Sequence, residues 1–499
     1  MNRIQLVASP FYGEPDFSRL ADAGACGRLD AVSLADLLRN GFVYPPFSIY
    51  ENVRLVSCGF DPAQDMFGDP VYRPLFAQSM PRPAPSGSGR APQAPARDWA
   101  GEYHRLLRDA VAAASERMAS PWLLQSGGKD STSLAIAASE ARPDTVCVTY
   151  LGGLEEDEVA SARQVAQGLG LRHEALVCDP GRAYDRYLAL LPRMPLLTAD
   201  FALLSYADLA TEIVRQGGDG VLDGLGSDVY LGVPPTWHKR MLRLLARGVR
   251  LPRFVDDAPW LGRSFELSYL LATLRMHPYE RGFPGSRFSD TEVDALFGRC
   301  VAQQSRARLA RFAPAMAAAG GLTEQLSITL DIMACPGGMA KGLYTAAALS
   351  LRVAYPYCDP RLWHWITREV PPEQRMDARR GINKVLVREH IARRFPRLPY
   401  VLAKKGSFRF DLRGLARQRY DQVYAYAERV RDVLPGAPAW LARHRKRLDN
   451  KYDASKFYLL AVTLPWVDRH ARGCRMVPES AREANPPRLA EEGAQGVPA

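Results

Sequence analysis

The sequence predicts an α/β protein: a doubly wound parallel sheet with a large surrounding helical region. Short apolar segments alternate with segments of helical spacing between residues 122 and 226, and glycine-rich turns join them. Residues 237–350 and 361–470 are rich in Leu, Ala and Arg with helical periodicity. Alternating strands and helices are typical of a parallel sheet, whose ligands bind outside the carboxyl ends of the strands.

The predicted elements follow one another in a regular order. Residues 122–125 are an apolar segment that meets a glycine turn, after which the segment STSLAIAASEA has helical spacing. The β-branched segment 145–151 predicts a second strand, and segment 157–170 predicts a helix that ends on glycines. Segments 173–178 and 218–226 predict two further strands, the second of which runs into a glycine-rich loop.

The composition excludes several classes of protein. Of the 499 residues, 47% are apolar and 24% are charged, which is typical of a globular chain and excludes wholesale disorder. The sequence has no run of about 18 apolar residues, which would predict a transmembrane helix. It also has no early apolar segment of the kind that predicts a secretory signal peptide. The eight cysteines are scattered singly, so we expect a reducing cytoplasm and no metal-thiolate site. The net charge of +11 favours a polyanionic partner, such as nucleotide phosphates, RNA, or an acidic peptide or carrier protein.

Composition also divides the chain. Residues 80–98 are rich in Pro, Gly and Ser, which is typical of a solvated linker, and residues 476–499 have the composition of a disordered tail. The linker separates a head, residues 1–79, from a main domain, residues 99–475.

The motif most informative about chemistry is SGGKDST, residues 126–132, which lies between the first predicted strand and its helix. Gly127 and Gly128 let the backbone approach an anion closely, and Ser126 and Ser131 add hydroxyl donors. The positive end of the following helix attracts negative charge. The motif therefore predicts a pyrophosphate-binding loop.

Within this loop, Asp130 would repel a phosphate unless a cation lay between them, so we expect it to bind Mg²⁺. Lys129 faces either the phosphates or solvent, and the sequence leaves both alternatives open. The pattern GxxxxGK[ST] is absent from the motif, so it is not a Walker P-loop.

The motif resembles the SGGxDS loop of ATP pyrophosphatases, and the chain from about residue 30 to 410 resembles the asparagine synthetase and β-lactam synthetase family. Further segments match that family in its order: residues 30–59, 149–174, 220–232, 355–362 and 381–408. The resemblance implies a HUP-type fold, an ATP and Mg²⁺ requirement, and cleavage of ATP between its α and β phosphates to adenylate a carboxylate.

The resemblance also implies roles for particular residues. Asp228 would be the second Mg²⁺ ligand, opposite Asp130. Lys405 falls on the catalytic lysine of the family, with Lys404 as the alternative if the register shifts by one. Lys384 is a second catalytic and phosphate-binding candidate, together with Arg388. The residues predicted to bind ATP are Leu124, Ser126, Gly127, Gly128, Lys129, Asp130, Ser131, Val148, Gly224 and Gly226.

Leu124 and Val148 are predicted to border the adenine, with packing in the sheet core as the alternative. Gly224 and Gly226 would permit close approach of the backbone to the nucleotide.

The chain also departs from the family pattern. Asn2 stands where glutamine-hydrolysing members carry a nucleophilic Cys, and the head is too short for a glutaminase domain, so we expect no glutamine-derived ammonia from this chain. Leu225 replaces a Glu or Tyr that helps to deprotonate the nucleophile. Either another group does so, with Asp223 and Tyr230 the closest in sequence, or the nucleophile arrives without needing a strong base. Arg352 replaces an acidic residue and either clamps an anionic substrate group or is structural.

These observations favour an AMP-forming ligase that makes an amide or lactam in specialised biosynthesis, for example by closing a macrolactam or a lasso peptide. Its partners would be a carboxylate-bearing small molecule or peptide, with a precursor peptide, a carrier protein or a separate ammonia-supplying subunit as further partners, and no membrane. One alternative is an RNA-modifying SGGxDS enzyme, which the basic charge favours and the absence of an RNA-binding module disfavours. Another is a decayed synthetase that acts as a binding subunit, for which Leu225 is the best support.

Overall fold

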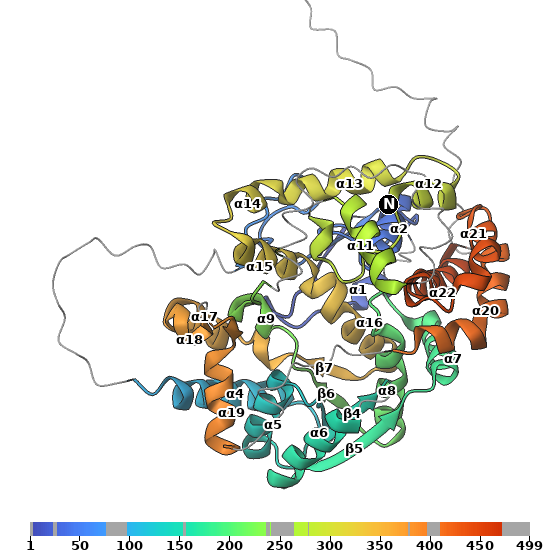
Figure 1. Ribbon diagram of the computed structural model, residues 1–499. Coiled ribbons are helices and arrows are strands. Elements are labelled where there is room, and N and C mark those ends of the chain that lie inside the picture. The colour runs from blue at the N-terminus through green and yellow to red at the C-terminus, as the bar shows by residue number, and fades with distance from the viewer. Residues whose placement is uncertain are drawn as a thin grey trace, which may run out of the picture.

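The largest sheet of the protein has five parallel strands in the order β5-β4-β3-β6-β7 (Figure 1). The structure is a computed structural model that describes residues 3–22, 27–75, 97–152, 156–235, 240, 264–277, 279–377, 380–396 and 410–471. The five strands are β3 (Pro121–Leu124), β4 (Val146–Leu151), β5 (Arg172–Val177), β6 (Gly220–Leu222) and β7 (Arg352–Ala354). The chain moves outward from β3 to β5 and then returns to β6 on the other side, so the predicted doubly wound sheet is confirmed.

The sheet is buried on both faces because the apolar side chains of its central strands alternate between two sets of helices. Leu123, Cys147 and Leu222 pack with α4 (Trp99–Ser115) and α5 (Lys129–Ala141). Their strand neighbours, including Trp122 and Val221, pack on the opposite face with α8 (Leu203–Arg215) and α16 (Ala340–Leu349). Strands buried in this way appear in the sequence as continuous apolar runs, which explains why they could be predicted.

Helices surround this sheet, as expected (Figure 1). Two helices, α6 (Glu156–Gly168) and α19 (Val385–Arg394), lie beside α4 and α5. Two others, α7 (Pro180–Leu190) and α9 (Ser227–Leu231), lie beyond the sheet. The upper helical region contains α11 (Phe265–Arg275), α12 (Asp290–Phe297), α13 (Ala302–Leu309), α14 (Ala313–Ala318) and α15 (Leu322–Met333), after which a π-helical turn (Ala334–Met339) leads into α16. The remaining elements are α17 (Pro360–Arg368), α18 (Pro372–Arg375), the pair β8 (Met376–Asp377) and β9 (Ile382–Asn383), α20 (Leu412–Arg429), α21 (Ala437–His444) and α22 (Lys451–Ala471).

The sequence did not predict β7, which has only three residues and therefore shows no periodicity. Its first residue, Arg352, pairs with Gly220 at the start of β6 and donates its backbone N–H to the carbonyl of Asp219 at 3.0 Å. Arg352 is exposed at the end of the sheet opposite the ligand-binding loops. This position supports the structural alternative for Arg352 and argues against a role in clamping substrate.

The head of the chain packs directly against the main domain. It contains a parallel pair, β1 (Ile4–Val7) and β2 (Val53–Val56), the short helix α1 (Ser18–Asp22), and α2 (Ala31–Asn40), which contacts α12, α13 and α22. Asp36 on α2 is fully buried and accepts hydrogen bonds from Ser305 at 2.5 Å and from Arg308 at 2.9 Å. Buried ionic groups of this kind stay paired because an unpaired charge would be costly.

The predicted linker and tail lie almost entirely outside the described residues, and the domain boundaries stay predictions. At the end of the linker, Asp98 caps α4 by accepting the backbone N–H of Gly101 at 3.0 Å. Among the helices that the structure describes, none combines the length and apolar character needed to cross a membrane.

Asp331 on α15 holds the end of the head and makes its stability depend on pH. One carboxyl oxygen accepts hydrogen bonds from Tyr72 at 2.7 Å and from the backbone N–H of Leu75 at 3.2 Å, whereas the other is buried without a hydrogen-bond partner. Burial raises the pKa of Asp331 from 3.8 to about 7. The group therefore stabilises the fold fully below the unfolded pKa, and this contribution is lost as the pH rises through about 7.

We expect Asp331→Asn to flatten this dependence, because an amide stays neutral at every pH. Between pH 4.5 and 7.5, the free energy of unfolding of the wild type should fall relative to that of the variant by about 2–4 kcal/mol. Denaturant unfolding of both proteins at the two pH values measures the difference. Parallel pH profiles would show that Asp331 is ionised in the folded protein.

Candidate functional site

The candidate site lies at the carboxyl ends of β3 and β6, which are neighbours in the sheet. The chain leaves β3 for the strands on one side and returns through β6 on the other, so the loops after these two strands diverge and leave a crevice. The first loop, residues 125–128, leads into α5, and the second, residues 223–226, leads into α9. The predicted phosphate and metal motifs occupy these two loops.

Hydroxyl groups hold the first loop closed. Ser131 Oγ donates to the backbone carbonyl of Ser126 at 2.5 Å and lies 3.1 Å from that of Gly128. Ser126 Oγ accepts the backbone N–H of Gly128 at 3.3 Å. Ser131 is therefore predominantly a loop-shaping residue here, while the half-buried Ser126 remains at the surface of the loop.

Glycine is required at one position of the second loop. Gly226 has φ +111°, a conformation that side chains rarely adopt, and a Cβ built there would lie 2.9 Å from Cys358 Sγ. Asp223 Oδ1 accepts the backbone N–H of Leu225 at 3.1 Å and stabilises the turn. Gly224 lies against the start of α5, where an added Cβ would be 3.5 Å from the backbone nitrogen of Ser131.

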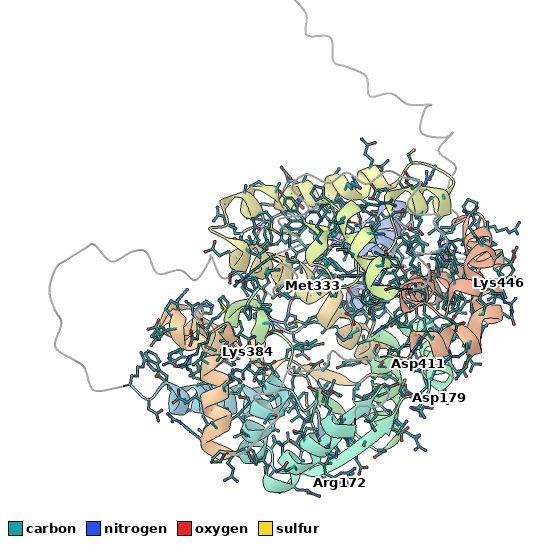
Figure 2. All side chains as sticks on the ribbon, viewed as in Figure 1. Arg172, Asp179, Met333, Lys384, Asp411 and Lys446 are labelled. Carbon is teal, nitrogen blue, oxygen red and sulfur yellow. The ribbon has the colours of Figure 1, made fainter. Side chains whose placement is uncertain are left out.

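Lys384 joins the two loops. Its Nζ lies 2.6 Å from Asp130 Oδ2 and 2.6 Å from Asp228 Oδ1, and it donates to Ser227 Oγ at 3.0 Å. Ser227 Oγ in turn donates to Asp130 Oδ1 at 2.9 Å. Figure 2 shows Lys384 where α19 begins, next to α9. Three residues predicted from distant parts of the sequence thus meet at one ammonium group.

Lys384 stays protonated and positively charged although its side chain is only 3% exposed. Burial alone would lower its pKa, but the charges and hydrogen bonds of Asp130 and Asp228 outweigh burial and raise the pKa above its ordinary value. The backbone of Lys384 has φ +57°, an unfavourable conformation for a residue with a side chain. Strain of this kind persists where surrounding contacts impose it, and it clusters at functional sites.

The two carboxylates fit a magnesium ion that is shared with a nucleotide. Mg²⁺ is usually bound by one or two carboxylates, with phosphate oxygens and water completing the shell. Asp130 and Asp228 converge on the ammonium of Lys384 and are 22% and 50% exposed, so they are the side chains that would hold such an ion. No group of three or more His, Cys, Asp or Glu side chains with metal-binding geometry occurs in residues that the structure describes, so a dedicated all-protein metal cage is not found there.

The predicted adenine-bordering residues are neighbours. Leu124, the last residue of β3, pairs in register with Val148 in the middle of β4, and the backbone carbonyl of Val148 accepts the N–H of Gln125 at 2.9 Å. Val148 is buried in the core with α8, and Leu124 packs against the same cluster while remaining half-buried. Of the two, Leu124 is the better placed for a nucleotide.

Lys405 and its alternative Lys404 lie outside the described residues. Gly127 is buried in the first loop, and Lys129 is half-buried at the start of α5. Arg388 lies one turn after Lys384 on α19 and donates its Nε to the carbonyl of Asn383 at 2.9 Å.

Tyr230, one of the two substitutes predicted for the lost Glu or Tyr, is not a proton acceptor in this structure. Tyr230 is buried, and its hydroxyl donates to the backbone carbonyl of Tyr357 at 2.9 Å. Burial raises its pKa well above the ordinary value, so the hydroxyl stays protonated. Leu225 packs against the core and offers no proton-transfer group.

Two contributors to the site were missed from the sequence. Ser227 bonds both Lys384 and Asp130, and its place within the second motif could have revealed it. Tyr357 donates its hydroxyl to the backbone carbonyl of Asp130 at 3.0 Å. Tyr357 lies within the segment 355–362 that resembles the family, but only the tertiary structure reveals its contact with Asp130.

Comparison with known proteins agrees with the geometry. A family model described as asparagine synthase matches residues 102–450, which include both loops and Lys384. No curated protein matches the chain.

Proposed function

The chain belongs to the asparagine synthase family, and from this premise we propose that it is an AMP-forming ligase that adenylates a substrate carboxylate and joins it to an amine. The family supports an ATP-dependent, amide-forming ligase. The observation that carries the finer proposal is the convergence of Asp130 and Asp228 on Lys384 at the switch point of the sheet.

The arrangement suits the charge of the reaction. Two carboxylates can hold Mg²⁺, which would neutralise charge on the departing pyrophosphate when bound. The ammonium of Lys384 is fixed between the carboxylates and can stabilise charge that develops on phosphate oxygens. A decayed binding subunit would have no need to keep a strained, buried lysine in this position.

The proposed reaction has two steps. A carboxylate oxygen of the substrate attacks the α-phosphorus of ATP, and the bond from that phosphorus to the bridging oxygen breaks with release of pyrophosphate. An amine nitrogen then attacks the acyl carbon of the adenylate, the carbon–oxygen bond to AMP breaks, and the nitrogen loses a proton. The first loop would hold the phosphates through its backbone N–H groups and the start of α5.

The amine donor is part of the same proposal. Leu225 in place of an acidic residue or tyrosine fits an acceptor different from ammonia on aspartate, namely an amine of the substrate or of a second molecule. We therefore place the reaction in specialised biosynthesis, with a carboxylate-bearing small molecule or peptide as substrate and lactam or macrolactam formation as the model reaction.

Product analysis tests the proposal. Purified protein is incubated with ATP, Mg²⁺ and a panel of amino acids and short peptides that carry free carboxylates, and nucleotides are separated by chromatography. We expect AMP and pyrophosphate in equal amounts with at least one substrate. Formation of ADP and phosphate instead would overturn the proposed chemistry.

A further inference from the structure

A continuous chain of hydrogen bonds runs from the protein surface to the first phosphate loop. Glu140 Oε2 lies 3.0 Å from His104 Nε2, and His104 Nδ1 lies 2.9 Å from His390 Nε2. His390 Nδ1 lies 2.8 Å from Ser133 Oγ, which lies 3.1 Å from the hydroxyl of Tyr103. These groups come from α4, α5 and α19, which pack against one another (Figure 1).

Tyr357 connects this chain to both loops of the site. The hydroxyl of Tyr103 donates to that of Tyr357 at 3.3 Å, and Tyr357 donates to the backbone carbonyl of Asp130 at 3.0 Å. The backbone carbonyl of Tyr357 accepts the hydroxyl of Tyr230, which lies on α9 beside Asp228. Tyr357 therefore bridges α5 and α9, the helices that follow the two loops and carry the predicted magnesium ligands.

The number of protons decides whether every link of the chain is made. The six links between Glu140 and the carbonyl of Asp130 need one proton each. Three hydroxyls carry three protons, and two neutral imidazoles carry two more, which leaves one link without a proton. One additional proton on the histidine pair completes the chain: the link to Glu140 is then donated towards the surface, and every other donor is directed towards Asp130.

The burial of each group shows which members of the chain keep their protons. The tyrosines keep their protons, since burial raises the pKa of Tyr103 to about 12 and that of Tyr357 well above its ordinary value. Burial, with the charges of His104 and Arg393, lowers the pKa of His390 to about 3. Of the two histidines, His104 is the one that reaches the protein surface, since it is 25% exposed and has the carboxylate of Glu140 as a partner.

The charged groups around the pair are accounted for. Glu140 comes from α5, and Arg393 comes from α19, where it pairs with Asp98 at 2.5 Å and with Glu389 at 2.7 Å. When the additional proton leaves, the 3.3 Å contact between Tyr103 and Tyr357 is the longest link and the least costly to leave without a proton.

We propose that His104 and His390 form a proton-dependent positioning relay, which in its protonated form fixes Tyr357 against both loops and strengthens the binding of Mg·ATP. This role rests on the proposed function, because it requires the site to bind ATP. The histidines touch no substrate; they act through Ser133, Tyr103 and Tyr357 on the backbone of the loop.

Tyr103→Phe tests the relay, because it removes two links and keeps the buried ring. The measured quantity is the dissociation constant of Mg·ATP for the variant divided by that for the wild type, which cancels the titration of ATP itself. One intact hydrogen bond changes affinity by about fivefold, so we expect a ratio of about five at pH 6.0 that falls towards one at pH 8.5. Histidines titrate across this range.

Tyr355→Phe is the matched control, since it removes another buried tyrosine hydroxyl, one that donates to the carbonyl of Met339 at 3.0 Å outside the relay. Its ratio should not change with pH. If the ratio of dissociation constants for Tyr103→Phe did not change with pH, the hydrogen bonds would have only a structural role, and the proposal would be overturned. Wild-type protein that binds no ATP at either pH would overturn the proposed function and the relay together.

A folding defect in Tyr103→Phe would show as a lost thermal transition. In that case His104→Gln, at a partly exposed position, provides the same test by removing the imidazole at the surface end of the relay. For this variant too, we expect the ratio of Mg·ATP dissociation constants to fall from about five at pH 6.0 to about one at pH 8.5. A ratio that does not change with pH would again contradict the relay.

Discussion

Lys384→Met should reduce pyrophosphate release by about 10²–10³-fold, the loss typical of removing one preorganised charge-stabilising donor. Methionine preserves the length of the side chain but leaves the carboxylates of Asp130 and Asp228 without the ammonium that lies 2.6 Å from each. The free energy of unfolding should fall by about 1–3 kcal/mol. This is less than for a fully buried pair, because both carboxylates are partly exposed. Steady-state pyrophosphate release and denaturant unfolding measure the two effects.

Lys456→Met is the matched control for this substitution. Lys456 on α22 is also a buried lysine, but it pairs with Glu292 on α12 at 2.7 Å. Its loss should cost a similar amount of stability, about 1–3 kcal/mol, since Glu292 is also partly exposed, and should leave the activity of the folded protein unchanged. Equal losses of activity in the two variants would show that Lys384 acts only through folding.

Asp130→Asn should produce the second large loss, also about 10²–10³-fold in pyrophosphate release, because a carboxylate that can hold Mg²⁺ becomes a neutral amide. The amide can still accept the hydrogen bond from Ser227, now 2.9 Å from Oδ1, so the loop should keep its shape. The Mg²⁺ concentration for half-maximal activity should rise. Titration of the activity with Mg²⁺ at saturating ATP measures this shift.

Asp144→Asn controls for the loss of a carboxylate near the same helix. Asp144 lies just beyond the far end of α5, is 51% exposed and pairs with Arg142 at 2.8 Å. We expect wild-type activity and an unchanged Mg²⁺ requirement. If Asp130→Asn kept wild-type activity, Asp130 would not be a metal ligand, and its only role would be to pair with Lys384.

Most of the sheet could be predicted because its central strands are buried on both faces and therefore read as apolar runs. Segments 122–125, 145–151 and 173–178 agree with β3, β4 and β5 to within one residue at each end. The strand β7 could not be predicted in the same way, since it begins with an exposed arginine and forms no buried apolar run, and its pairing partner lies more than a hundred residues earlier. The position of Arg352 in this strand favours the structural one of the two roles that the sequence left open.

The candidate site was predictable where a motif carries its own chemistry. The SGGKDS loop and the second glycine-rich loop are contiguous in sequence, and their glycines and carboxylates indicate phosphate and cation binding without further information. Lys384 was identified through resemblance, but its burial, its left-handed backbone and its position between two carboxylates are consequences of packing.

The sequence by itself determined the doubly wound sheet, the two loops and the residue types that face a nucleotide, because apolar periodicity and turn chemistry are local properties. The tertiary structure decided which of those residues meet. Hydrogen bonds that join residues 104, 133, 357 and 390 depend on three helices and one loop packing at a fixed distance, and no local pattern specifies that distance. The positions of the loops therefore depend on the folded chain, whereas the chemistry of the loops follows from the residue types in the motifs.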